Sequence, residues 1–286
     1  MRNNKFIIDT DIGSDIDDAL ALLLCLKVEN FPLKAITTVY NCAELRAKIA
    51  KKLEGLGMLD KTEMRLSPSY YGIEENGIDL LIQTIQENPK NIEIISLGQF
   101  TNIATALIQN AEISDQISRI WSMSAGISFI DPIPEGFPNP ERVYKAIPSH
   151  NIRCDIKAAK IVLNSKIPIT FIGNDVTTQV LFYESYIDLV ESAGSVLNQK
   201  VMDMARIWLT YRSRRLEQKV KKTCLHDALV VAESIGMNFT EKIPINIKID
   251  EFGGTEVQYN PDSIYEIAYS VKPNEFIKWY LDIISN

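Results

Sequence analysis

Apolar runs alternate with amphipathic runs along the first two thirds of the chain, and each apolar run has the length of a single strand. This alternation is typical of strand–helix–strand units, whose parallel strands are buried on both faces. The predicted strands are Lys5–Asp9, Leu33–Val39, Glu63–Leu66, Ile92–Ser96, Ile120–Met123 and Ile167–Ile172. The predicted helices are Asp17–Val28, Ala43–Glu54, Gly77–Gln86, Asn102–Gln109, Ile156–Asn164, Asn198–Leu216 and Asp227–Ser234.

The last third of the chain has a different pattern. Three further strands are predicted at Pro244–Ile249, Glu256–Tyr259 and Ile267–Ser270, followed by a helix at Pro273–Ile284. The sequence shows no repeat and no low-complexity tract, so we interpret residues 1–286 as a single domain. The predicted fold class is α/β: an open, mostly parallel sheet flanked by helices, with additional C-terminal strands.

Composition narrows the possible functions. With 286 residues, 46% of them hydrophobic, the chain can bury a large core. A net charge of -7 gives no general attraction to nucleic acid or to an anionic membrane. No stretch reaches the ~18 apolar residues of a membrane span, and the start lacks the pattern of a signal peptide. The scattered cysteines show no CxxC spacing, so we expect a cytoplasmic protein without disulfides.

Acidic residues gather near the N-terminus, at positions Asp9, Asp11, Asp15, Asp17 and Asp18. An apolar strand precedes them and a helix follows, so they occupy a strand-to-helix turn at the carboxyl edge of the sheet, where open α/β folds bind ligands. Asp15 or Asp17 could simply cap the helix. Five carboxylates, however, repel one another unless a cation lies among them, and oxygen-only ligands suit Ca²⁺ or Mg²⁺. The turn therefore predicts a metal site within an active site.

Other polar residues lie at similar edge positions. His226 and Asp227 open a predicted helix, where they could be functional or only a polar residue and a cap. Thr101 is a natural cap of another helix, although a backbone carbonyl in such a turn can also bind a hard cation. Asn41 follows the second strand and is either a turn residue or part of the same site. His150 alone favours neither a packing nor a functional role.

Several segments match one known pattern in order along the chain. They are DTDIGSDIDDA at 9–19, LGQFTNIA at 97–104, NIRCDIKAA at 151–159, DVT at 175–177 and LHDALVVA at 225–232. Together they resemble the inosine-uridine-preferring nucleoside hydrolase family, whose fingerprint is Asp-x-Asp-x-x-x-Asp-Asp. The matches span nearly the whole chain, and the ordered set is far more specific than any one of them.

The resemblance implies a Rossmann-like core and a Ca²⁺-dependent enzyme that hydrolyses the N-glycosidic bond of ribonucleosides. The implied metal ligands are Asp11, Asp18, the Thr101 carbonyl and Asp227. The implied catalytic residues are Asp11, which takes a proton from water, and His226, which protonates the departing base. The implied substrate-binding residues are Asp17, Asn41, Met123 and Asn151. The implied partner is a small ribonucleoside, and the implied assembly is a homodimer or homotetramer.

The sequence departs from the family pattern at two places near the sugar. Ser14 and Asp15 lengthen the acidic turn; we align the paired carboxylates on Asp17 and Asp18, because the other register places Ile16 at a ligand position. Ser149 stands where the family has a glutamate that contacts the ribose 5′-hydroxyl. We therefore expect a changed preference at the 5′ end or for the base.

Two further segments leave alternatives open. The proline-rich segment 131–148 lacks helical or strand periodicity and is either a surface excursion or a substrate loop. The basic stretch Arg212–Lys222 is either a solvated helix end or the source of an arginine that recognises an anionic substituent.

Two other functional classes compete with the hydrolase. One is a catalytically inactive protein that binds ribose or nucleosides on the same scaffold, an idea that Ser149 favours. The other is a haloacid-dehalogenase-like phosphatase, whose first strand also ends in Asp-x-Asp. That class has no place for the Asp17–Asp18 pair, and Gly13 comes one position late for its motif.

Overall fold

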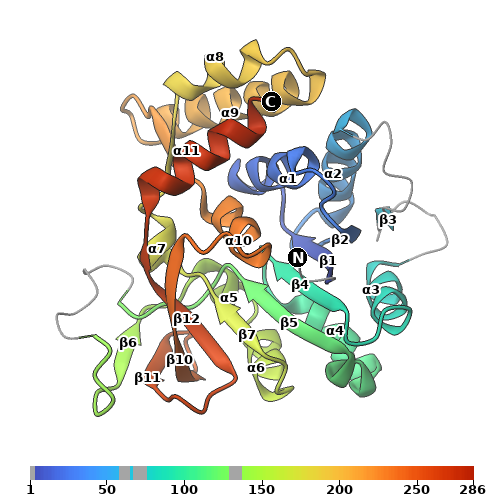
Figure 1. Ribbon diagram of the computed structural model, residues 1–286, viewed down its shortest axis with the longest axis vertical. Coiled ribbons are helices and arrows are strands. Elements are labelled where there is room, and N and C mark those ends of the chain that lie inside the picture. The colour runs from blue at the N-terminus through green and yellow to red at the C-terminus, as the bar shows by residue number, and fades with distance from the viewer. Residues whose placement is uncertain (1–3, 58–64, 67–75, 129–136) are drawn as a thin grey trace.

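The computed structural model describes residues 4–57, 65–66, 76–128 and 137–286. Within these ranges ten strands form one sheet in the order β3-β2-β1-β4-β5-β7-β12-β10-β11-β6 (Figure 1). The strands from β3 to β12 are parallel: β3 Arg65–Leu66, β2 Leu33–Thr38, β1 Lys5–Thr10, β4 Ile92–Ser96, β5 Ile117–Ser122, β7 Ile169–Phe171 and β12 Tyr265–Val271. An antiparallel extension follows: β10 Thr240–Ile249, β11 Thr255–Tyr259 and β6 Tyr144–Ala146.

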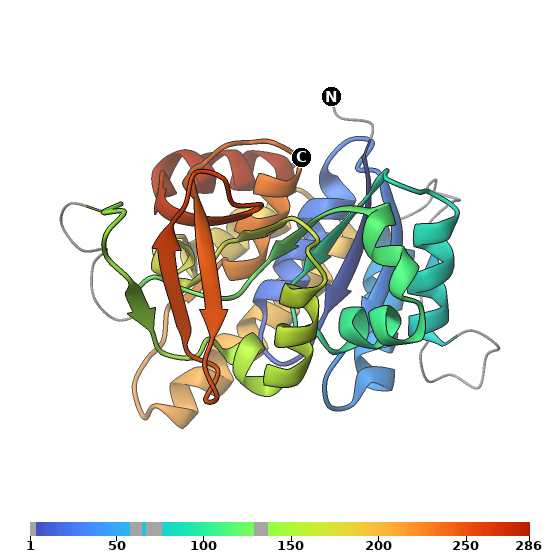
Figure 2. The same ribbon diagram turned by 90° about the horizontal axis from the view of Figure 1, so that it is seen from below.

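Helices cover both faces of the sheet because successive residues of a strand point to opposite sides. Ile7 of β1 packs in a core with α3 (Gly77–Gln86), α4 (Thr101–Gln109) and α6 (Ile156–Asn164). Ile8 packs in a second core with α1 (Asp17–Lys27), α9 (Val196–Arg215), α10 (His226–Ser234) and α11 (Pro273–Ile284). Seen from below, β10 and β11 lie on the opposite side of the molecule from α3 (Figure 2). The sheet is therefore the middle of three layers.

The remaining elements are α2 Ala43–Gly57, the 3₁₀ helix Ala111–Gln116, α5 His150–Cys154, α7 Asn174–Thr177, α8 Ser185–Ser192, and the separate antiparallel pair β8 Leu181–Tyr183 and β9 Lys222–Cys224. Of these, α2 and α8 contribute residues to the same core as α1. No helix among the described residues is long and apolar enough to cross a membrane. The four cysteines are free thiols, as the sequence predicted.

The strand order confirms the predicted mostly parallel α/β fold. The chain order runs outward from β1 in both directions, so the order reverses between β1 and β4. Ligand crevices in open α/β sheets lie at such a switch point, outside the carboxyl ends of the strands. At this point Asp9 of β1 is paired with Thr37 of β2 on one side and with Ser96 of β4 on the other.

One sequence-based prediction about the fold was wrong. The segment 131–148 was expected to lack strand structure, yet Tyr144–Ala146 forms β6 and pairs with β11 through Ala146 and Thr255. The strand is only three residues long and lies between prolines, so it has too few residues to show a strand periodicity. It is extended because it pairs with β11. Residues 131–136 of that segment lie outside the described residues.

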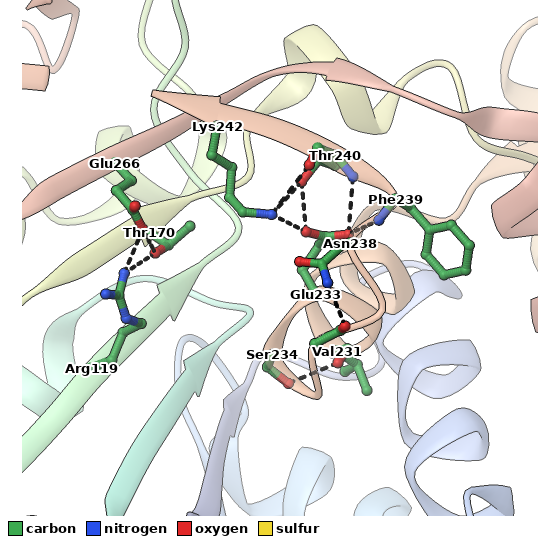
Figure 3. Close-up of polar contacts among 11 residues, drawn as sticks. Arg119, Thr170, Val231, Glu233, Ser234, Asn238, Phe239, Thr240, Lys242 and Glu266 are labelled. Atoms are coloured by element: carbon green, nitrogen blue, oxygen red, sulfur yellow. Dashed lines mark hydrogen bonds and ion pairs between the residues drawn. The ribbon is translucent and has the colours of Figure 1, made fainter. Parts of the chain in front are cut away.

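A buried ionic network fixes the carboxyl end of α10 to the sheet (Figure 3). The Glu233 carboxylate accepts hydrogen bonds from the amides of Phe239 and Thr240, at 2.6 and 3.1 Å, and forms an ion pair with Lys242. The Glu233 side chain is fully buried, so each of these contacts is shielded from water. The network holds α10 against β10 and thereby positions the residues at the opposite end of α10.

Candidate active site and metal centre

Four carboxylates converge at the switch point. Asp11 and Asp15 follow β1, Asp18 lies in the first turn of α1, and Asp227 lies in the first turn of α10. All four interact electrostatically with one another. Ligand oxygens of Asp15, Asp17 and Asp18 lie within 4.8 Å of one another. We call Asp11, Asp15, Asp18 and Asp227 the acidic cluster.

Burial makes negative charge unfavourable in this cluster. It raises the pKa of Asp15 to about 7 and holds the pKa values of Asp18 and Asp227 well above their ordinary range. Charge repulsion between the carboxylates adds to that effect, because an adjacent anion also favours the protonated form. A divalent cation bound among these oxygens would compensate both effects, so the donor set fits a hard metal ion.

The acidic turn is held together by its own polar residues. The Thr10 hydroxyl donates to the Asp18 carboxylate, and the Asp17 amide donates to Asp15 Oδ1 at 3.0 Å. Gly13 has a φ of 99°, a backbone conformation that disfavours side chains, so a glycine suits this position. The N-cap of α1 is Ile16, without a side-chain cap hydrogen bond, so neither Asp15 nor Asp17 is the helix cap, and Asp15 belongs to the acidic cluster.

Asp9 lies one layer beneath the cluster and is fully buried. Its Oδ1 accepts hydrogen bonds from the Thr37 hydroxyl at 2.6 Å and the Asn102 amide at 2.8 Å. Its Oδ2 has no hydrogen-bond partner among the described residues. Burial raises the pKa of Asp9 to about 7. The Asp9 side chain therefore joins the carboxyl ends of β1 and β2 to the first turn of α4.

Arg46 of α2 clamps the acidic turn to the loop after β2, a role that the sequence did not reveal. Its guanidinium donates to the carbonyls of Asp11 and Ile12 and, at 2.9 Å, to the Ser14 hydroxyl. Its Nε donates to the Asn41 carbonyl at 2.8 Å. Arg46 is buried, whereas its neighbours on α2 are basic residues in solvent, so no local pattern distinguished it.

His226 lies at the start of α10, beside Asp227. Its Nδ1 is 2.7 Å from the hydroxyl of Thr177, a buried residue of α7. Burial lowers the pKa of His226 to about 4, so at pH 7 only about one molecule in a thousand carries an imidazolium there. The imidazole is therefore a neutral hydrogen-bonding group at neutral pH.

The residues predicted to bind the sugar lie around the ends of β2, β4 and β5. Asn151 is buried, and its amide donates to the carbonyls of Leu97 at 2.6 Å and Met123 at 2.8 Å. Both of its donor protons are used, so its Oδ1 is the atom left to accept from a ligand. Met123 is half-buried, Asp17 is buried in the first turn of α1, and Asn41 is exposed.

Thr101 opens α4, the helix that follows β4. Its hydroxyl donates to Asp155 at 2.7 Å, and its carbonyl accepts the Thr105 hydroxyl at 2.7 Å within α4. The backbone of Gly98 lies against Asp11, since a Cβ on Gly98 would be 3.3 Å from the Asp11 Cβ. The role of the Thr101 carbonyl as a metal ligand stays a prediction.

Two residues near the predicted 5′ side are also placed. Ser149 is buried, and its hydroxyl accepts a hydrogen bond from the Ala125 amide at 3.3 Å, so it points into the loop after β5. His150 is exposed; its Nε2 is 3.4 Å from Cys154 Sγ, and its ring meets Tyr40 edge-on. His150 also interacts electrostatically with Asp11, which places it at the mouth of the site.

Comparisons with known proteins identify the family of this chain. The family model described as "Inosine-uridine preferring nucleoside hydrolase" matches residues 53–278. The pyrimidine-specific ribonucleoside hydrolase RihA of Shewanella sp. (strain ANA-3) is 27% identical over 241 residues, covering 73% of this chain and 71% of RihA.

Solved structures show the same fold. A plant nucleoside hydrolase, the PpNRh1 enzyme, superposes with a TM-score of 0.77 at 19% identity, over 99% of each chain. A purine-preferring ribonucleoside hydrolase from Gardnerella vaginalis also has a TM-score of 0.77, at 23% identity, over 99% of this chain and 98% of that one. The family match covers most of the chain, so this protein belongs to the inosine-uridine preferring nucleoside hydrolases, enzymes that cleave N-glycosyl bonds of nucleosides.

Proposed function

We propose that this protein hydrolyses the N-glycosidic bond of ribonucleosides in a Ca²⁺-dependent reaction that releases the free base and ribose. The observation that carries the proposal is the convergence of Asp11, Asp18 and Asp227 in one buried cluster at the switch point of the sheet. The acidic cluster also separates this proposal from the phosphatase alternative, which has no use for carboxylates on both α1 and α10.

The metal ligands in this proposal are the carboxylates of Asp11, Asp18 and Asp227. The Thr101 carbonyl, at the start of α4, completes the proposed set. The set contains only oxygen, which is the preference of Ca²⁺. When bound, the ion would hold the ribose diol and lower the pKa of a water molecule.

Asp11 accepts the proton of the attacking water in this scheme. Its carboxylate is the one that follows β1 directly, at the switch point. Arg46 fixes the Asp11 backbone and also favours the ionised carboxylate that a general base requires.

The sugar passes through a positively charged, oxocarbenium-like state as the bond to the base breaks. We assign Asp17, Asn41 and Asn151 to the ribose hydroxyls and Met123 to packing against the sugar. Asn151 Oδ1 accepts from a hydroxyl, because its amide protons are already used. Carboxylate and amide oxygens fixed in advance around the ring stabilise the developing charge electrostatically.

We assign His226 to the departing base. A Thr177 hydroxyl that donates to Nδ1 leaves the proton of the neutral ring on Nε2, which can then donate to the base. His226 thus acts as an oriented donor and not as a stored imidazolium, because its pKa is about 4.

The preferred substrate differs from that of family members with a glutamate at the 5′ side. Ser149 is neutral, and its hydroxyl is already engaged by the Ala125 amide. We therefore propose that the 5′ end is recognised without a carboxylate. Efficient and equal turnover of inosine and uridine would count against a changed preference.

The test is release of reducing sugar from a nucleoside panel, including 5′-modified members, after chelation and again after Ca²⁺ is restored. Calcium-dependent release from wild type, with no release from a folded Asp11→Ala variant, is the expected result. Ligand binding without turnover across the panel would instead favour the inactive binding protein. Light scattering on the same sample tests the proposed homodimer or homotetramer.

A further inference from the structure

Arg212 is a cation that faces the acidic cluster from outside the proposed machinery. It lies near the end of α9, a helix that packs against α1 and α2, and its side chain is half-buried. Its guanidinium lies over the Trp208 ring, 5.7 Å from the ring centroid. It interacts electrostatically with Asp15 and with Cys224, which is two residues before His226.

The donors of Arg212 are not used within the protein. Among the described residues, its guanidinium has neither a hydrogen-bond partner nor an ion-pair partner within 4 Å. The side chain of Arg46, by contrast, donates hydrogen bonds to three carbonyls and a hydroxyl. A half-buried guanidinium with free donors, held flat on an indole, can bind a ligand oxygen without first breaking another contact.

The position of Arg212 places it on the base side of the site. Cys224 and His226 flank the start of α10, and His226 is the residue assigned to the base. Asp15, which the longer acidic turn introduces, interacts electrostatically with Arg212, so the arginine lies close enough to the acidic cluster to feel its charge.

We propose that Arg212 contacts the leaving base and stabilises the negative charge that develops on it as the N-glycosidic bond breaks. This inference rests on the proposed function. The bond between C1′ and the base nitrogen breaks, and its electron pair moves onto the base. Water oxygen forms the new bond to C1′ and Asp11 takes one proton of that water. The base anion, to which His226 Nε2 donates a hydrogen bond, takes its proton from solvent water after departure. The favoured class of substrate carries ring carbonyl oxygens that hold this charge, as uracil-type bases do.

The experiment compares two leaving groups in wild type and in Arg212→Met and Arg212→Gln. The uracil base of uridine is a poor leaving group and needs stabilisation. The p-nitrophenolate of p-nitrophenyl β-D-riboside is a good leaving group and needs none. We expect kcat for uridine to fall about 100-fold, the scale of one removed oxyanion donor. We expect KM to change little, and kcat for the p-nitrophenyl riboside to fall by less than about threefold on the same scale. Arg212→Lys retains the charge and should recover part of the uridine rate.

Arg214→Met is the matched control. Arg214 belongs to the same helix, but it lines a separate cavity of about 800 Å³ between α8 and α9, together with Arg206 and Lys221. Both of its rates should match wild type. Equal losses on both substrates in Arg212→Met and Arg212→Gln would show a structural role and overturn the inference, and so would no loss on either. Wild type that hydrolyses neither substrate would defeat the proposed function as well.

Discussion

The carboxyl groups of Asp18 and Asp227 face each other where the first turns of α1 and α10 meet, and each is fully buried. Burial, and after it the repulsion between the two groups, holds both pKa values well above their ordinary range. Negative charge is therefore costly at the place where the proposed cation binds. This contact links the acidic turn to the far end of the sequence and makes the pair a direct test of the metal site.

Replacing Asp227 with asparagine should raise the stability of the metal-free protein and at the same time abolish metal binding. The amide can donate to the Asp18 carboxylate and removes the repulsion, so the free energy of unfolding without metal should rise by about 1–3 kcal/mol at pH 7.5. The stabilisation by Ca²⁺ and the nucleoside turnover should both be lost. Thermal unfolding with and without Ca²⁺ checks this, with the exposed Glu251→Gln as control. A variant that keeps its calcium-dependent shift would remove Asp227 from the ligand set.

The metal-free protein should lose stability as the pH rises. Burial raises the pKa values of Asp9 and Asp15 from 3.8 to about 7, so the folded chain binds protons more tightly than the unfolded chain. The resulting stability is fully present below the unfolded pKa and is lost as the pH rises through about 7, at roughly 1.4 kcal/mol per pKa unit for each group. Tm measured in chelator from pH 4.5 to 8 should fall, and saturating Ca²⁺ should flatten the profile. A Tm in chelator that rises with pH would contradict this account.

Arg46→Met should weaken metal binding without touching a proposed ligand. The guanidinium fixes the carbonyls of Asp11 and Ile12 and joins them to the loop at Asn41. Residues that orient ligands in this way typically account for about 10–100-fold in metal affinity. Calcium titration by calorimetry measures the change, and Lys48→Met, an exposed substitution on the same helix, serves as control. An unchanged dissociation constant for Ca²⁺ would show that the clamp has no part in positioning Asp11.

The two ionic networks in Figure 3 should differ in their contribution to stability. Glu233→Gln leaves the half-buried Lys242 ammonium beside a neutral amide in a buried setting, and breaking such a pair costs about 3–5 kcal/mol. Glu266→Gln breaks a more exposed pair with Arg119, whose side chains are 38% and 25% accessible, and should cost at most about 1 kcal/mol. Urea unfolding measures the loss of stability in both variants. Equal losses would mean that burial does not set the difference.

The sequence was sufficient where periodicity or a helix start identifies a residue. The apolar run of β1 and the helical run of α1 confine the acidic turn between them, and the structure puts that turn at the predicted sheet edge. Asp227 was found in the same way, because it opens α10 directly after a polar histidine. Both residues were identified from local patterns. Such patterns predict position correctly when a long buried element follows them in the chain.

The sequence was insufficient where the position of a residue depends on tertiary packing between distant segments. The close approach of the Gly98 backbone to Asp11 joins residues far apart in the sequence, so the motif at 97–104 could not show it. Arg46 looks like any basic residue of an amphipathic helix until α2 packs beside the acidic turn. Strand β6 depends on β11, which lies about a hundred residues further along the chain. Burial of His226, which sets its pKa, likewise comes from packing.

The hydroxyl of Tyr280 in α11 donates to the carbonyl of Leu20 in α1 at 3.0 Å, and Tyr280 is fully buried between the helices. During synthesis, the ribosome therefore releases the acidic turn long before the helix that supports α1 has been made. Asp227 also emerges late, so the nascent chain carries an incomplete set of carboxylates for most of its translation. Capture of the proposed cation by the full set of carboxylates would consequently be a late event in the life of this polypeptide, after residue 227 has been made.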